Sequence, residues 1–456
     1  MHETTGTEVP TRRDQIARLD RIPVWPYRRL VIVTIGVSYL FAFFDISTYG
    51  LTLPVMVDQL HSTLAALSVA LTTNLIGYVV GAYFIATLSD MYGRRPAFLL
   101  AALAVSIGSL FTAATMNGAW LDACRFVTGI GIGAEIALAA TYIGEIAPRA
   151  VRARYNAWAT VWAGVGISLV PFLALALVPH LTWGWRALYV LGALGGIAAI
   201  ATPWVLPESP RWLIAKGRIA EAEVIVAEAE RTALQRHDGP LPEPAQAAAD
   251  VPAERFPTTE IVRRPYLTRV LLWIAVWFFI YIANYGWLGL GPTLLKKQGF
   301  SLSSTYALLL FSSFGTLAGV LSATRLVDLI DRKYIATGAT LTAAMGMLAI
   351  AFFPNSAVIP ISAFVTALGT AVGTAVLYLY TAEHFPTRAR TTGVALTDGL
   401  GHLGGALAPL LVLGAYAQVG FRGAFIFQAV CLVVASTLVA LFGLRTRNMS
   451  LEQLAS

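Results

Sequence analysis

The chain has 456 residues, of which 57% are hydrophobic and 12% are charged, and its formal net charge is +7. A soluble protein usually has about a quarter of its residues charged, so this composition excludes a soluble globular protein and predicts an integral membrane protein. The two cysteines, Cys124 and Cys431, exclude a disulfide framework and a cysteine-built zinc site.

The N-terminal segment, residues 1–27, is polar and charged and contains no apolar core. We therefore expect it to be a cytosolic tail and not a cleavable signal peptide. Apolar stretches long enough to cross a bilayer, about 20 residues each, follow in a first group of six. They lie near residues 30–54, 67–88, 97–116, 119–143, 155–178 and 186–206.

A polar stretch, residues 207–266, separates this group from a second one. It is rich in Ala and Glu and then in Pro and Ala, so we expect short cytosolic helices and a loose linker. So short a segment could bury little core, which argues against a separate catalytic domain. Six further spans are expected near residues 268–291, 304–326, 335–353, 357–381, 392–416 and 422–444.

The sequence thus predicts an all-α membrane protein with twelve transmembrane helices in two six-helix bundles. We expect one bundle in residues 28–206, the other in 267–446, and a cytosolic tail in 447–456. With both termini in the cytosol, 27 of the 32 Lys and Arg residues lie on that side, as the positive-inside rule requires. The predicted location is the plasma membrane or a bacterial inner membrane. The net charge is explained by topology, so we expect the lipid bilayer and no nucleic acid as a partner.

An internal repeat links the two halves at a constant offset of 238 residues. Pro54 corresponds in this way to Pro292, and Asp90 to Asp328. Glycines, charged residues and prolines match across five spans without a gap, which predicts duplicated, pseudo-symmetric bundles. Two parallel bundles of this kind are suited to alternating access, with the substrate held between them near the midplane.

The repeated charges follow the second, fourth, eighth and tenth spans. In each motif a carboxylate is followed by basic residues in a tight turn, close enough for charge-assisted hydrogen bonds. We interpret them as a cytosolic gate that holds helix ends together in one state, the alternative being charge that only sets topology. The gate residues are Asp90, Arg94, Arg95, Glu145, Arg152, Asp328, Arg332, Glu383 and Arg390.

These motifs resemble those of the major facilitator superfamily over essentially the whole chain. Asp90 with Gly93-Arg94-Arg95 is similar to that family's signature between spans two and three, although Ala86 and Met91 depart from it. Pro207-Glu208-Ser209-Pro210-Arg211-Trp212-Leu213 is similar to the signature of sugar porters and the related organic-ion and metabolite transporters. The resemblance implies the major facilitator fold and transport by alternating access.

Polar residues that break the repeat are candidate functional residues, because ionisable groups inside a membrane are costly. Asp45 in span one corresponds to Ala283, and Arg125 in span four to Ala363. Proton-coupled sugar porters carry an acid and an Arg in these spans, so the resemblance implies that Asp45 and Arg125 couple transport to protons. The alternative is a static ion pair. Glu135 is either a second proton carrier, a substrate contact or a loop anchor.

Candidate substrate-binding residues lie mainly in spans seven and eleven. Span seven lacks the Gln pair of sugar porters and is more similar to transporters of organic acids such as nicotinate. Asp398 and His402 lie one turn apart on one face of span eleven, where the His either binds a substrate carboxylate or is an ordinary interior His. We expect substrate contacts from Tyr49, Trp158, Trp162, Tyr281, Asn284, Tyr285, Tyr378, Asp398 and His402. Tyr78 and Tyr380 are further aromatic candidates for lining the cavity.

No pattern of a soluble enzyme is present, and we expect no enzymatic activity, metal or organic cofactor, with the proton as coupling ion. The sequence predicts a monomeric symporter that takes up a small organic acid, nicotinate-like or an aromatic carboxylate. One alternative is a sugar, polyol or organic-cation transporter of the same superfamily. Another is a nutrient receptor that binds its ligand without transporting it.

Overall fold

The computed structural model describes residues 12–244, 263, 266–385 and 390–445, and the regular structure in this part is α-helical. Inside a bilayer a helix satisfies its backbone hydrogen bonds within one segment, so a continuous apolar run of about 20 residues forms a helix. The first six spans are α2 (Arg29–Gln59), α3 (Leu64–Tyr92), α4 (Arg94–Ala113), α5 (Gly118–Ile146), α6 (Arg152–Leu177) and the consecutive helices α7 (Gly184–Ala193) and α8 (Gly195–Val205).

The second half contains α11 (Tyr266–Lys297), α12 (Leu302–Leu329), α13 (Arg332–Phe352), α14 (Val358–Glu383) and α15 (Arg390–Phe442). Helix α15 is 53 residues long and contains Gly420 with φ 72° and ψ −156°, so it is two spans joined at a kink. The prediction of twelve spans is therefore confirmed. Polar side chains fix several helix starts; Thr63, for example, accepts a hydrogen bond from the Ala66 N–H.

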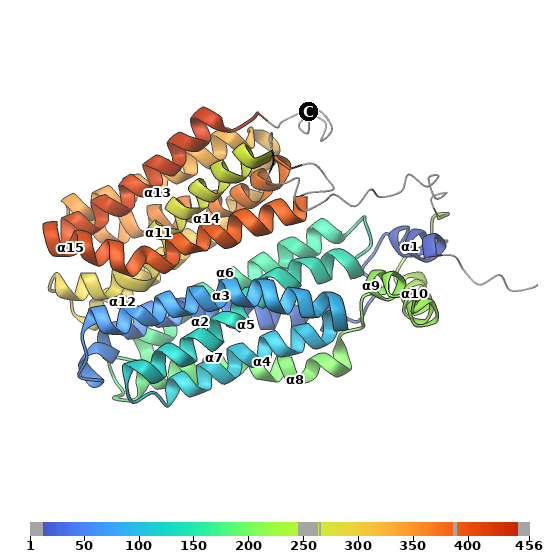
Figure 1. The fold of residues 1–456 in the computed structure, drawn as a ribbon, viewed down its shortest axis with the longest axis horizontal. Coiled ribbons are helices and arrows are strands. Elements are labelled where there is room, and N and C mark those ends of the chain that lie inside the picture. Colours follow the sequence, from blue (N-terminus) through green and yellow to red (C-terminus); the bar gives the residue numbers. More distant parts are fainter. Residues whose placement is uncertain (1–11, 245–262, 264–265, 386–389, 446–456) are drawn as a thin grey trace, which may run out of the picture.

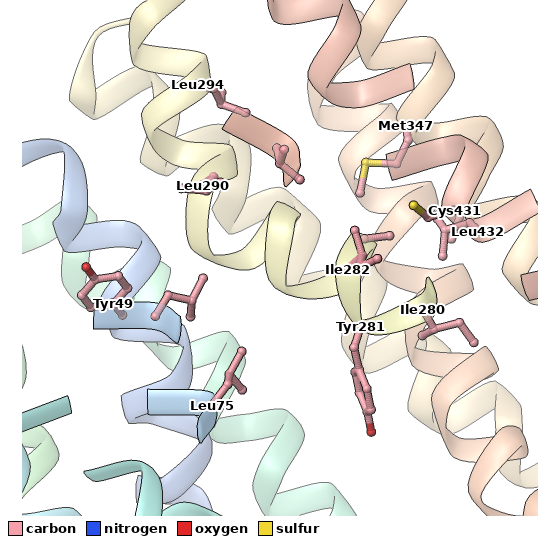
Figure 2. Packing of buried hydrophobic residues seen from close by; sticks show 14 of the residues in the cluster. Tyr49, Leu75, Ile280, Tyr281, Ile282, Leu290, Leu294, Met347, Cys431 and Leu432 are labelled. Atoms are coloured by element: carbon pink, nitrogen blue, oxygen red, sulfur yellow. The ribbon is translucent and has the colours of Figure 1, made fainter. Parts of the chain in front are cut away.

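The two halves form separate bundles that lie side by side, the first drawn from blue to green and the second from yellow to red (Figure 1). Within the first, α3 packs along α5, and within the second, α11 packs along α15. Large aromatic side chains such as Trp185 and Trp277 are completely buried. In the second bundle, Met347 and Leu432 pack close to Ile282 (Figure 2).

Three shorter helices lie at one end of the molecule, which we call the linker end (Figure 1). They are α1 (Arg12–Asp20), α9 (Pro210–Ala215) and α10 (Ile219–Leu234). The two linker helices were expected, whereas α1 lies in a segment predicted only as a polar tail. Arg18 of α1 contacts Glu223 and Glu230 of α10 at 2.7 and 2.6 Å, so α1 is held by ion pairs that an apolar pattern does not reveal.

The halves contact each other toward the opposite end, which we call the far end. Lys296 Nζ lies 2.6 Å from Asp58 Oδ2, and these two positions are related by the offset of 238. Gly50 faces the Leu288 carbonyl oxygen, and a Cβ on Gly50 would lie 1.8 Å from it; these positions are again 238 apart. Equivalent residues thus meet each other, which places the pseudo-twofold axis between α2 and α11.

Candidate functional site

Asp45 on α2 and Arg125 on α5 form an ion pair inside the first bundle. Arg125 Nη1 lies 2.5 Å from Asp45 Oδ1, and each residue is only 1% exposed. The hydroxyl of Ser109 on α4 donates to the other carboxylate oxygen. Tyr189 places its ring 5.9 Å from the guanidinium carbon. A charge pair buried this deeply depends on both partners, because removing one leaves the other uncompensated at a cost of about 3–5 kcal/mol.

Close helix packing positions this pair. The Asn74 side chain on α3 donates to the Arg125 carbonyl oxygen at 2.8 Å. Two turns later, Gly133 on α5 lies against the backbone of Tyr78 on α3. Because this glycine has no side chain, α3 and α5 can approach closely. Their close packing fixes the position of Tyr78 relative to Arg125.

Glu135 lies further along α5 and takes no part in the Asp45–Arg125 pair. It is 1% exposed, and its Oε1 atom has no hydrogen-bond partner in the part of the chain described here. Tyr39 on α2 lies within electrostatic reach of both Glu135 and Asp398. Glu135 and Asp398 therefore both lie in the region around Tyr39.

A second group of polar and aromatic residues lies at the interface of the two bundles. Tyr281 on α11 and Tyr378 on α14 both donate to Asp398 Oδ1, at 2.5 and 2.8 Å, and their hydroxyl oxygens are 3.0 Å apart. Figure 2 shows Tyr281 directed away from Met347 and Leu432, the core of its own bundle. We call this group, together with three neighbouring side chains, the tyrosine–histidine cluster: Tyr78, Tyr281, Tyr285, Tyr378, Asp398 and His402.

His402 joins the cluster to the first bundle. Its ring stacks on Tyr78 of α3, with centroids 4.0 Å apart and an interplanar angle of 18°. Tyr281 covers the ring at 3.9 Å, and Tyr285 lies at 5.9 Å. Asp398 is one turn earlier on α15, and its Oδ1 lies 3.6 Å from His402 Nδ1. The expected pairing of Asp398 and His402 is thus present, and Tyr78 places it against the other half of the molecule.

Four expected substrate contacts lie elsewhere. Tyr49 donates its hydroxyl to the Leu67 carbonyl and places its ring 5.5 Å from the Arg125 guanidinium carbon, so it lies beside the Asp45–Arg125 pair. Trp158 is 47% exposed on α6, and Trp162 packs against Gly36 of α2. Asn284 lines a small hollow within the second bundle, together with Thr340 and Thr374. The further aromatic candidate Tyr380 donates to the Leu444 carbonyl.

The expected gate residues of the first half form one connected group at the linker end. Arg94 contacts Asp90 at 2.5 Å and Glu145 at 2.7 Å. Glu208 accepts hydrogen bonds from the Arg94 and Arg95 N–H groups and thereby caps α4. This gives the Pro207–Leu213 motif a physical role, because its Glu attaches the linker to the gate group.

Two further ion pairs involve expected gate residues, each within one half, and Asp20 was not among the residues predicted. Arg152 lies 3.1 Å from Asp20 of α1, and Arg332 lies 3.1 Å from Glu383. The side chains of Asp328 and Arg390 lie outside the described residues. Between the described residues of the two halves, no ion pair is found at the linker end.

Some residues of the site were not predicted. Ser109 corresponds at offset 238 to Met347, so the comparison that singled out Asp45 would also have found it. Tyr39 corresponds to Trp277, and that indole is 5.2 Å from the Tyr281 ring. Equivalent aromatic positions of both halves thus lie near the site, and residues that keep their aromatic character in the repeat are not singled out by its asymmetry.

Comparisons with known proteins all match this chain to membrane transport proteins. The family model "Sugar (and other) transporter" matches residues 34–456. YyaJ of Bacillus subtilis, provisionally named a metabolite transport protein, is 30% identical over 94% of this chain and 95% of its own. The niacin transporter NiaP of Acinetobacter baylyi is 28% identical over 97% and 99%. In structure, the partially occluded inward-open xylose transporter XylE of E. coli matches with a TM-score of 0.72, 18% identity and coverage of 92% and 99%.

Proposed function

The chain belongs to the sugar (and other) transporter family of the major facilitator superfamily, and we propose that it takes up a small organic acid together with protons by alternating access. The observation that carries this proposal is the Asp45–Arg125 pair, which is buried inside the membrane-spanning part and hydrogen-bonded by Ser109. When Asp45 is protonated, its attraction to Arg125 is lost. Proton binding and the packing of α2 against α5 are therefore linked.

The arrangement of the halves supports the same proposal. They contact each other toward the far end at Asp58–Lys296, and near the middle of α3 at the stack of Tyr78 on His402. We infer that the linker end faces the cytosol, because most basic residues lie there. In that orientation the contacts close the outer side, as expected for the state that releases substrate inward.

A nicotinate-like or aromatic acid is the substrate class we favour. The cluster is built mainly from aromatic rings, with Tyr78, Tyr281 and Tyr285 around His402, and an aromatic lining of this kind suits a flat ring. A niacin transporter is among the relatives. The second candidate is an organic cation, favoured by the two acids Asp398 and Glu135 beside aromatic rings.

Uptake into proteoliposomes tests both parts of the proposal. The probes are nicotinate, xylose and choline, each supplied with and without an inward proton gradient. We expect nicotinate to accumulate only with the gradient. Choline accumulation would identify the cation transporter, and xylose accumulation the sugar transporter. A receptor would bind a probe without moving it.

Asp45→Asn tests the coupling. We expect it to lose nicotinate accumulation driven by the proton gradient while it still exchanges nicotinate across the membrane. Asp122→Asn is the matched control, because Asp122 is a half-buried acid on α5 near Arg125 but outside the pair. The double variant Asp45→Asn/Arg125→Gln removes the uncompensated charge and tests whether loss of folding explains the result. Wild-type accumulation by Asp45→Asn would refute the coupling role.

A further inference from the structure

We propose that His402 binds the carboxylate of the substrate only together with a proton, so that the anion and this proton occupy the tyrosine–histidine cluster as a pair. The inference rests on the proposed function. It assigns the selectivity of the transporter for carboxylates to one atom, Nε2 of His402. The argument depends on the hydrogen bonds of the imidazole and on the charges around it.

The backbone fixes which nitrogen carries the hydrogen in the neutral ring. His402 Nδ1 lies 2.9 Å from the Asp398 carbonyl oxygen, and a carbonyl only accepts hydrogen bonds. Nδ1 is therefore the protonated nitrogen, and Nε2 keeps its lone pair. Within the described chain, Nε2 has no hydrogen-bond partner. In the neutral ring it accepts from a ligand, and it becomes a donor only when the ring gains a second proton.

Among the described residues around His402 there is no fixed positive charge for an anion. The neighbours of His402 are Tyr78 from α3, Tyr281 and Tyr285 from α11, and Asp398 from its own helix. Tyr378 from α14 contacts Asp398. Within the described part of the first bundle, Tyr39 of α2 and Glu135 of α5 are further titratable groups in this region. Both charged members of the set are acids.

Arg125 does not fill this role, because its guanidinium is engaged by Asp45 and by the rings of Tyr49 and Tyr189. A carboxylate placed in the cluster would face Asp398 and Glu135 unless a cation lay between. An imidazolium at His402 provides that cation. Asp398, 3.6 Å away, and the ring faces of Tyr78 and Tyr281 would stabilise it.

The proton and the charge balance without another reactant. A proton from water binds to Nε2, the new N–H donates to the substrate carboxylate, and the imidazolium–carboxylate pair is neutral. When the carboxylate leaves, the proton returns to water on the side of release. By linkage, each species strengthens the binding of the other.

Isothermal titration calorimetry of the full chain with nicotinate, in buffers of different ionisation enthalpy, measures the protons taken up per nicotinate. We expect wild type to take up about one proton more than His402→Gln. Over the pH range in which nicotinate binding takes up the His402 proton, the wild-type Kd should rise about tenfold more per pH unit than the Kd of His402→Gln. His402→Lys supplies a fixed cation and should bind nicotinate without this proton.

His384→Gln is the matched control, a buried His in the same bundle that contacts Tyr380 and Leu444; it should keep the wild-type proton uptake. Equal proton uptake by wild type and His402→Gln, or uptake of the same proton by His402→Lys, would overturn the inference and leave the proposed function standing. A wild-type protein that binds choline or xylose but no carboxylate would overturn the proposed function and this inference together.

Discussion

Gly133 on α5 has no room for even the smallest side chain. A Cβ there would lie 2.0 Å from the Tyr78 carbonyl oxygen of α3, whereas Gly144 on the same helix has nothing within 4 Å. Gly133→Ala should therefore force the helices apart at a cost of about 1–3 kcal/mol. Gly144→Ala should leave stability unchanged or slightly raised, because Ala is the better helix former. Thermal unfolding in detergent measures the difference, and equal midpoints for both variants would contradict it.

For single residues, the sequence predicted which buried charged residues are paired better than it predicted which side of a helix faces the interior. Asp45 and Arg125 stand out because isolated charges in apolar spans need partners, and the structure pairs them. Trp158 and Trp162 remain predictions as substrate contacts; on α6 the first is 47% exposed and the second packs against Gly36. A helix that is apolar on all sides carries no periodic signal for which face is inside. The stack of Tyr78 on His402 joins spans far apart in the chain, and a linear pattern does not specify such a contact.

At the scale of elements, α1 is held to α10 by charge. Glu230 accepts from both Arg18 and Arg21. Burial alone would raise the pKa of Glu230, but these hydrogen bonds outweigh it and hold the pKa below its ordinary value. The contribution of Glu230 to stability is therefore complete above the ordinary Glu pKa of about 4.3 and is lost as the pH falls through the lowered value.

We accordingly expect Glu230→Gln to loosen α1 at neutral pH. Two arginines lose a partly buried partner, a change of about 1–2 kcal/mol that speeds amide exchange in residues 12–20 by a factor of about 5–30. Hydrogen–deuterium exchange read by mass spectrometry measures it. Glu228→Gln is the control, because Glu228 is exposed and pairs only with Arg231 of its own helix. If the two variants exchange alike, α1 is not held by this cluster.

The repeat predicted the architecture of the whole molecule, because duplicated spans must form similar bundles. It did not predict that equivalent residues would touch. Gly50 meets Leu288, and Asp58 meets Lys296. Contacts between equivalent residues occur only near the axis that relates the halves. Here they connect the two halves at the far end. At the equivalent positions 58 and 296 the charges are opposite, so this contact between the halves is attractive.

The Asp58–Lys296 pair should shift the equilibrium toward molecules that are closed at the far end, without making that state permanent. Asp58 is 64% exposed and Lys296 30%, so the attraction is worth about 0.2–1 kcal/mol, a factor of about 1.4–5 in the ratio of far-end-closed to far-end-open molecules. Asp58→Lys should lower that ratio by repulsion, and so should Lys296→Asp. The exchange Asp58→Lys/Lys296→Asp should restore it.

Spin labels at His61 and Gln298, with Cys124 and Cys431 replaced by Ala, report the distance distribution in each variant. Failure of the exchanged pair to recover the closed population would show that the Lys296 hydrogen bond to the Pro54 carbonyl, and not charge, joins the halves there.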